Sequence, residues 1–175
     1  MKKYELTEET KIWQGVTLRR VKALRSFGDV VEGQVGGWIE KEENLSHQGE
    51  AWVCDEAKVY GKAMVYGKAE VCSEAQVYGN AQVYDEAWVC GKAEVFDSAR
   101  VFGKTVVEGK AVVCDNAQVT GNALVYGEAV VEGKALVYGY AQIYGNALVY
   151  GNAVVYGNTV VFGDDPHSKK FSVEV

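Results

Sequence analysis

A six-residue repeat constrains this chain more than any other feature. From residue 51 to residue 164 the sequence repeats the pattern A-x-V-Y-G-N, which gives 19 units in 114 residues without an insertion or a deletion. The first position is Ala except at Thr105 and Thr159, and the third is Val except at Ile143. Self-similarity of this regularity predicts a solenoid, in which every unit adds the same small piece of structure to its neighbour.

The pattern inside each unit predicts a strand followed by a corner. Positions one and three lie on the same side of an extended segment, where small Ala and β-branched Val suit a tight interior. Gly and Asp accept a left-handed backbone, so the fifth position is expected to turn the chain. That position is Gly in 14 units and otherwise Asp55, Ser73, Asp85, Asp97 or Asp115. A four-residue strand and a two-residue corner, repeated, make a coil.

Residues 51–164 resemble the hexapeptide-repeat family, through stretches such as VYGNAQVYDEA (77–87) and VYGNAVVYGNT (149–159). The resemblance implies an all-β fold, the left-handed parallel β-helix, with three units in each triangular coil. The repeat would then make six to seven coils, about 30 Å tall at ~4.8 Å per strand.

Residues 1–50 are expected to form an N-terminal cap and the first coil, because the open end of a β-helix needs cover. The segments 4–7 and 16–24 predict a β-hairpin that turns near Gly15. The cap sequence resembles that of uncharacterised bacterial and phage hexapeptide-repeat proteins.

The coil is expected to begin at Ile39 and Leu45, which are six residues apart, with a bulge around residues 47–49. Residues 165–175 form a C-terminal tail in which 170–175 alternates like one more strand. This strand is expected to cover the last coil or to pair with a neighbouring subunit.

The net charge and the composition limit the classes of molecule that this chain is expected to bind. With 18 basic and 24 acidic residues the net charge is −6, which argues against binding to a nucleic acid polymer or to an anionic membrane. No apolar run approaches the roughly 18 residues of a spanning helix, and the first residues lack a signal-peptide core. The expected location is the cytoplasm of a bacterium or of a phage-infected bacterium, where the four Cys would be free thiols.

Three of the cysteines share one spacing. Cys54, Cys72 and Cys90 are each 18 residues apart, so they are expected to stack on one outer face, while Cys114 falls on a different face. No His or second Cys pair completes a zinc set. We therefore interpret these cysteines as small residues in the aromatic slot of the repeat, and we predict no metal and no cofactor.

An enzyme is not the favoured interpretation. Family members that are acyltransferases resemble one another in a catalytic His and projecting loops, and the carbonic-anhydrase-like members hold zinc with three His. This chain has only His47 and His167, and no loop interrupts the repeat. A general base needs a partner and a walled site. His47 is interpreted as a cap residue bonded to the backbone, and acyl transfer is kept as the least favoured alternative.

The outward positions predict self-association. At position four, spacing by 18 predicts aromatic ladders such as Tyr60-Tyr78-Phe96 and Tyr66-Tyr84-Phe102. A monomer would expose apolar columns larger than soluble monomers normally show, and the family resemblance implies a homotrimer. In the later coils position two is apolar except for Gln118 and Gln142, at Val106, Val112, Leu124, Val130, Leu136, Leu148, Val154 and Val160.

The basic residues between positions 10 and 28 suggest an anionic ligand. Residues 10–28 contain five basic residues and no acidic one, which fits either a solvated strand edge or an anion site between subunits. Trp52 and Trp88, on one face and two coils apart, would be interface anchors or would stack on a ligand. The candidate ligand-binding residues are Arg19, Arg20, Arg25, His47, Trp52, Trp88 and Arg100.

Two functions remain open beside acyl transfer. The first is a non-catalytic oligomeric binding protein that holds a small phosphate-bearing, nucleotide-like ligand between subunits and, in a phage, sequesters a host immune signal. The second is a structural or polymer-forming scaffold. The 50-residue cap favours the first, because polymerisation would suit bare ends.

Overall fold

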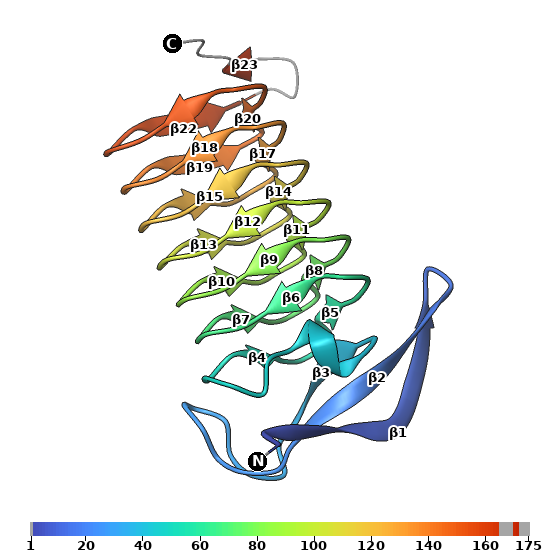
Figure 1. The fold of residues 1–175 in the computed structure, drawn as a ribbon. Helices are drawn as coiled ribbons and strands as arrows, with labels where there is room; N and C mark the ends of the chain where they lie inside the picture. The colour runs from blue at the N-terminus through green and yellow to red at the C-terminus, as the bar shows by residue number, and fades with distance from the viewer. Residues whose placement is uncertain (1, 165–169, 172–175) are drawn as a thin grey trace.

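Each six-residue unit contributes one short strand to a three-sided coil, and the coils stack into a parallel β-solenoid of about seven turns (Figure 1). The computed structural model describes residues 2–164 and 170–171. The fold class predicted from the repeat, an all-β parallel β-helix with an N-terminal hairpin, is confirmed.

Strands from every third unit pair in register to form the three faces. The ten-stranded sheet continues at its N-terminal end into the cap, and it contains, in order, β1 (Tyr4–Trp13), β2 (Val16–Ala23), β3 (Val35–Ile39), β5 (Lys58–Val59), β8 (Gln76–Val77), β11 (Glu94–Val95), β14 (Val112–Val113), β17 (Val130–Val131), β20 (Leu148–Val149) and β23 (Lys170–Phe171).

The other two faces lie wholly within the repeat. The seven-stranded sheet contains β4 (Trp52–Val53), β7 (Glu70–Val71), β10 (Trp88–Val89), β13 (Val106–Val107), β16 (Leu124–Val125), β19 (Gln142–Gly145) and β22 (Val160–Gly163). The six-stranded sheet contains β6 (Met64–Val65), β9 (Gln82–Val83), β12 (Arg100–Val101), β15 (Gln118–Val119), β18 (Leu136–Val137) and β21 (Val154–Val155).

Most paired strands are two residues long, shorter than the four residues predicted, and they comprise the second and third positions of the unit. Before the last coil, each unit is nevertheless joined to the next coil by three backbone hydrogen bonds. In one unit Glu94 N–H donates to Ala111 O at 2.9 Å, Phe96 N–H to Val113 O at 3.0 Å and Ser98 N–H to Asp115 O at 2.8 Å. The ladder therefore runs through the corners as well as along the strands.

The interior is filled by the first and third positions of the repeat. Their Ala and Val side chains are buried along the solenoid and form one continuous core. Thr105, which replaces an Ala, is also buried, and its hydroxyl donates to Phe102 O at 2.7 Å. The substitution is tolerated because the added polar group is satisfied locally.

The corners adopt the left-handed backbone that the fifth position predicts. The five units without Gly have positive φ at this position, for example 59° at Asp85 and 55° at Asp97. Asp85 Oδ2 also accepts a hydrogen bond from Gly103 N–H in the next coil at 3.3 Å. Asp is thus suited to the corner both by its backbone tolerance and by its side chain.

The predicted cap hairpin is present. β1 and β2 pair antiparallel, and β2 then pairs antiparallel with β3, so the hairpin ends the ten-stranded sheet (Figure 1). The tip of the hairpin lies along the outside of the coils, where Trp13 Nε1–H donates to Gln76 Oε1 at 3.0 Å. Among the described residues the helical structure is the 3-10 turn η1 (Glu42–Asn44), and none of them forms a helix able to cross a membrane.

The coil begins as predicted. β3 pairs with β5 through Ile39 and Val59, and Leu45 forms a bridge to Val65. At the C-terminal end β23 pairs in parallel with β20, so the tail adds a strand to the ten-stranded sheet. Residues 165–169, including His167, and residues 172–175 lie outside the described residues.

Candidate functional site

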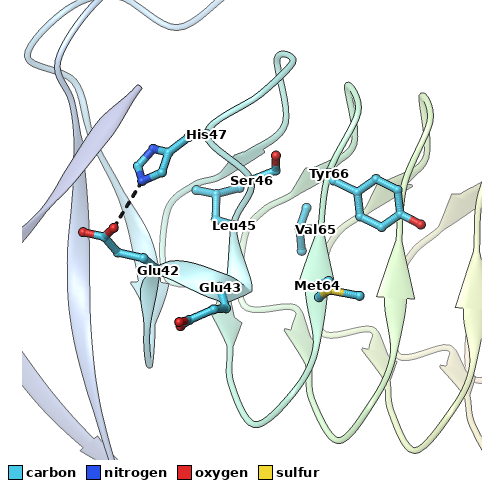
Figure 2. A pocket seen from close by; sticks show the side chains of 8 residues that line it. All are labelled: Glu42, Glu43, Leu45, Ser46, His47, Met64, Val65 and Tyr66. Carbon is cyan, nitrogen blue, oxygen red and sulfur yellow. Dashed lines mark hydrogen bonds and ion pairs between the residues drawn. The ribbon is translucent and has the colours of Figure 1, made fainter. Parts of the chain in front are cut away.

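The chain bulges where the cap joins the coils, and an open hollow of about 520 Å³ lies beside the bulge (Figure 2). Leu45, Val65 and Met64 give it an apolar floor. Tyr66 forms one side, and Ser46 and His47 belong to the bulge itself. Glu42 and Glu43 of η1 place carboxylates at its edge. The hollow exists because η1, rather than a strand, stands next to β6 on this face.

His47 is held as a structural residue at the edge of the hollow. Its ring stacks on Tyr4 at 4.3 Å between centroids, and its Nδ1 accepts a hydrogen bond from Lys3 N–H at 3.2 Å. Nε2 lies 3.4 Å from Glu42 Oε2 (Figure 2). The backbone bond to Nδ1 leaves the proton on Nε2, where it faces the carboxylate. Both ring nitrogens are therefore occupied, and the interpretation of His47 as a cap residue is confirmed.

The negative charge of Glu42 is balanced by a neighbouring lysine. Its carboxylate pairs with the Lys2 ammonium, and the hydrogen bond from Lys2 is the main reason that the Glu42 pKa lies below its usual range. Glu43 is exposed. The floor of the hollow is thus suited to an apolar or aromatic group, with carboxylates only at the rim.

A polar strip continues from the hollow along the six-stranded sheet. Met64, Gln82, Arg100 and Gln118 follow one another at in-register positions of β6, β9, β12 and β15. Arg100 is exposed and forms no ion pair among the described residues. We call Met64, Gln82, Arg100 and Gln118 the polar strip.

An aromatic ladder runs beside the polar strip. Tyr66, Tyr84 and Phe102 stack at 4.8 Å between successive centroids with their rings within 3° of parallel. Tyr66 is shared with the hollow, and its hydroxyl lies 3.5 Å from Gln82 Oε1. Burial raises the pKa of both Tyr66 and Tyr84, so both remain neutral hydroxyls at pH 7.

Arg20 is not available to a ligand, contrary to expectation. Its guanidinium lies 4.4 Å from the centre of the Trp38 ring and donates to Gly36 O at 2.9 Å and to Asp55 O at 2.7 Å. It also pairs with Glu56, which Lys11 contacts as well. Lys11 of β1 and Arg20 of β2 therefore hold the cap on the coil. Arg19 and Arg25 are exposed, and the Arg25 guanidinium lies 6.0 Å from the Phe27 ring centre.

Trp52 is buried, which corrects its expected outward role. It shares a column with Glu70 and Trp88 as predicted, but the cap covers it and leaves it 2% exposed. Tyr4 and Phe27 pack edge-on against its ring, at 6.5 and 5.5 Å between centroids. Trp88, two coils further on, is 43% exposed. The two tryptophans therefore cannot act together on a ligand.

The cysteines are placed as predicted and all four are free thiols. Cys54, Cys72 and Cys90 follow consecutive strands of the seven-stranded sheet, and Cys114 follows β14 of the ten-stranded sheet. Hydrogen bonds from Cys54 and then from the Trp88 indole lower the pKa of the Cys72 thiol. Burial raises the pKa of Cys114 to about 12.

One group of three metal-ligand side chains occurs among the described residues. Ligand atoms of Cys114, Asp115 and Glu132 lie within 4.8 Å of one another. However, Asp115 Oδ2 accepts a hydrogen bond from Gly133 N–H at 2.9 Å, and Asp55 and Asp85 make the equivalent bond at other corners. The position of Asp115 is therefore explained by the corner, without a metal.

Sequence reasoning missed the rest of the hollow. Val53 follows Leu45 by eight positions, where six are expected, which indicates a bulge at 47–49, and the hollow lies beside it. No signal in the sequence indicated that Glu43, Met64 and Tyr66 line one cavity, because η1 takes the place of a strand.

The comparisons agree with the repeat. The YdcK beta solenoid repeat model matches residues 75–91, 117–133, 141–157 and 149–163. The chain is also 35% identical over 74 residues to the "Uncharacterized acetyltransferase YdcK" of Escherichia coli (strain K12). That match covers 37% of this chain and 23% of the relative's length. The chain is therefore a repeat β-solenoid protein that is similar, over part of its length, to YdcK.

Proposed function

We propose that this protein is a non-catalytic, self-associating β-solenoid that binds a small phosphate-bearing ligand on the polar strip. The observation that carries the proposal is Arg100. Among the candidate residues it combines an exposed guanidinium, flanking amides from Gln82 and Gln118, and an adjoining aromatic ladder. A guanidinium with free donors binds phosphate in a bidentate manner.

The hollow supplies the second half of a ligand site. It lies two strand spacings from Arg100, about 10 Å along the polar strip. Its apolar floor and the edge of Tyr66 suit a flat ring, and the carboxylate of Glu43 would accept hydrogen bonds from ring amino groups. A nucleotide-like ligand presents these two parts, a base and a phosphate.

The contacts of His47 favour binding over catalysis at this residue. Both nitrogens of His47 are occupied by contacts within the cap, and a general base needs a free lone pair within reach of its substrate. The relative's name motivates acyl transfer as a second candidate, with His47 as the residue to test. Retention of any acyl transfer in His47→Ala would remove that role.

Self-association is supported by the second half of the seven-stranded sheet. Val160 and Phe162 are 54% and 40% exposed, and they continue a surface of half-buried residues that includes Leu124 and Tyr126. Apolar surface of this extent is typical of protein contacts. We propose that copies meet through this face in a closed homotrimer in the cytoplasm. A scaffold function would use the same surface and would need no ligand.

Native mass spectrometry of gently purified protein tests oligomerisation and ligand binding together. A closed oligomer with a stoichiometric excess mass supports the proposal, and a ladder of growing masses supports the scaffold. Leu124→Glu is expected to give monomers in light scattering. Gln82→Glu, also an outward position-two residue but in the polar half, is expected to leave the assembly intact.

Ligand binding is tested by calorimetry with linear and cyclic nucleotides and with inorganic phosphate. Arg100→Gln is expected to weaken nucleotide binding about 10-fold to 100-fold, because it removes a charge-assisted contact. Arg19→Gln, an exposed arginine in the cap, is the matched control and should bind as the wild type does. Equal loss in both variants would show general electrostatic attraction, and no binding by either form would exclude the proposed ligand class.

A further inference from the structure

The thiols of the seven-stranded sheet form a column that the proposed function does not use. Cys54 and Cys72 occupy the same repeat position in consecutive coils, directly after the paired strands β4 and β7. Cys54 Sγ lies 3.6 Å from Val71 O and Cys72 Sγ lies 3.9 Å from Val89 O, so each thiol lies toward the next coil. The column is therefore aligned along the solenoid axis.

The side chain of Trp88 contacts Cys72, the middle thiol of this column. The indole Nε1–H of Trp88, from the next strand of the sheet, donates to Cys72 Sγ at 2.9 Å. Trp88 is half exposed, while Cys72 beneath it is buried. An N–H donor directed at sulfur favours the thiolate over the thiol, and such donors support the thiolate ligands of metal sites.

The spacing of the two cysteines suits a bridging ion better than a disulfide. Disulfides require Cβ atoms ~3.5–4.5 Å apart, with the two side chains turned across each other. Parallel in-register neighbours instead hold their side chains alongside one another, about 4.8 Å apart. An ion midway between two sulfurs at that separation would have metal–sulfur distances of about 2.4 Å, close to the ~2.3 Å of zinc–thiolate bonds.

We propose that Cys54 and Cys72 form a two-coordinate site for a soft, thiophilic cation such as Cu(I), with the Trp88 N–H bonded to one of the ligands. Zinc would require further ligands, and among the described residues the one group of three donors lies elsewhere, at Cys114. Two thiolates with no hard oxygen or nitrogen ligand select a soft monovalent ion. Each cysteine loses one proton on binding, so one Cu(I) displaces two protons and forms two metal–sulfur bonds.

Competition for Cu(I) against a chromophoric chelator, without oxygen and with the thiols reduced, tests the site on the full chain. The wild type is expected to bind one Cu(I) tightly, with quenching of Trp88 fluorescence. Cys72→Ala is expected to lower the affinity at least 100-fold, because it leaves Cys54 and Cys90 two coils apart, each without a neighbouring thiol. Cys54→Ala is also expected to lower the affinity, and an unchanged affinity in that variant would overturn the pairing of Cys54 with Cys72. Cys114→Ala is the matched control, a thiol at the same repeat position on another sheet, and should bind as the wild type does.

Trp88→Phe distinguishes the site from a chance pair of thiols. It removes the N–H donor while keeping an aromatic ring, and it should weaken Cu(I) binding about 10-fold without changing the stoichiometry. Circular dichroism of each variant controls for folding. Equal affinity in Cys72→Ala and the wild type would overturn the proposal. So would tighter binding of Zn(II) than of Cu(I), or rapid formation of a Cys54–Cys72 disulfide under mild oxidation.

Discussion

The guanidinium of Arg20, in the cap, pairs with the carboxylate of Glu56, at the first corner of the repeat. The same carboxylate accepts hydrogen bonds from Lys11 Nζ at 2.8 Å and from Trp38 Nε1–H at 3.1 Å. Three cap residues thus meet on one acidic side chain. Glu56 therefore joins two parts of the chain that the repeat alone does not connect.

Loss of the Glu56 charge is expected to loosen the cap. Glu56→Gln leaves two cations facing a neutral amide and should lower the free energy of unfolding by about 1 kcal/mol, since the group is partly exposed. Hydrogen exchange should then be faster in β1 and β2 and unchanged in the distant coils. Glu74→Gln is the matched control at the same repeat position, since the Glu74 carboxylate pairs with Lys92 at 3.7 Å and, among the described residues, with no cation of the cap. Equal effects in both variants would contradict the role of Glu56.

Acid should detach the cap before it unfolds the solenoid. Hydrogen bonds from Lys11 and from other cap residues lower the pKa of Glu56 from 4.5 to about 2. The folded state therefore binds fewer protons at this group than the unfolded state, and the stabilisation is present above pH 4.5 and lost as the pH falls toward 2. Trp13 and Trp38 fluorescence against pH should report this loss in the wild type. A profile that is the same in Glu56→Gln would show that another group is responsible.

Lys3 should contribute stability that grows as the pH rises above about 8. The Lys3 ammonium is buried and donates to Ala51 O at 2.6 Å, and burial lowers its pKa from 10.5 to about 8. Between these values the unfolded state binds more protons at Lys3, so the contribution of this group to stability rises with pH. The buried thiols of Cys90 and Cys114, whose pKa values are raised from 9.0 to about 12, contribute with the opposite sign above about pH 9. Urea unfolding of the wild type and of Lys3→Met at pH 7.5 and pH 9.5 therefore measures the Lys3 contribution as the difference between the two pH dependences. Identical pH dependences in the two proteins would show that Lys3 contributes none of it.

The corners should tolerate a β-carbon poorly where coils stack. A Cβ at Gly79 would lie 2.8 Å from Asp97 N in the next coil, and its φ of +70° adds strain for any L side chain. Gly79→Ala should cost about 2 kcal/mol or more. Gly15→Ala has a similar φ of +81° but open space around it, so it should cost only the left-handed strain of roughly 1 kcal/mol. Thermal unfolding of both variants separates the two contributions, and equal losses would show that stacking adds none.

The sequence alone determined the solenoid, because the same pattern of buried and turning positions recurs in 19 consecutive units. Ala and Val at positions one and three lie on the same side of the strand and are buried together. Gly or Asp at position five favours the left-handed backbone that turns the chain. Local preference and burial therefore agree along the repeat. The bulge at residues 47–49 and the thiol column follow from the spacing of the repeat, and the hairpin near Gly15 follows from local strand and turn signals in residues 1–50.

Which outward-facing residues the cap buries was decided by the tertiary structure alone. Trp52 occupies an outward position of the repeat, yet the cap folds over it and buries it, and Arg20 is taken up by Glu56 in the same docking. Arg100 stays exposed because, within residues 2–164 and 170–171, no segment lies over β12. The repeat specifies which side of a strand a residue faces, whereas exposure also depends on which distant segment covers that side, and spacing along the chain does not encode that contact.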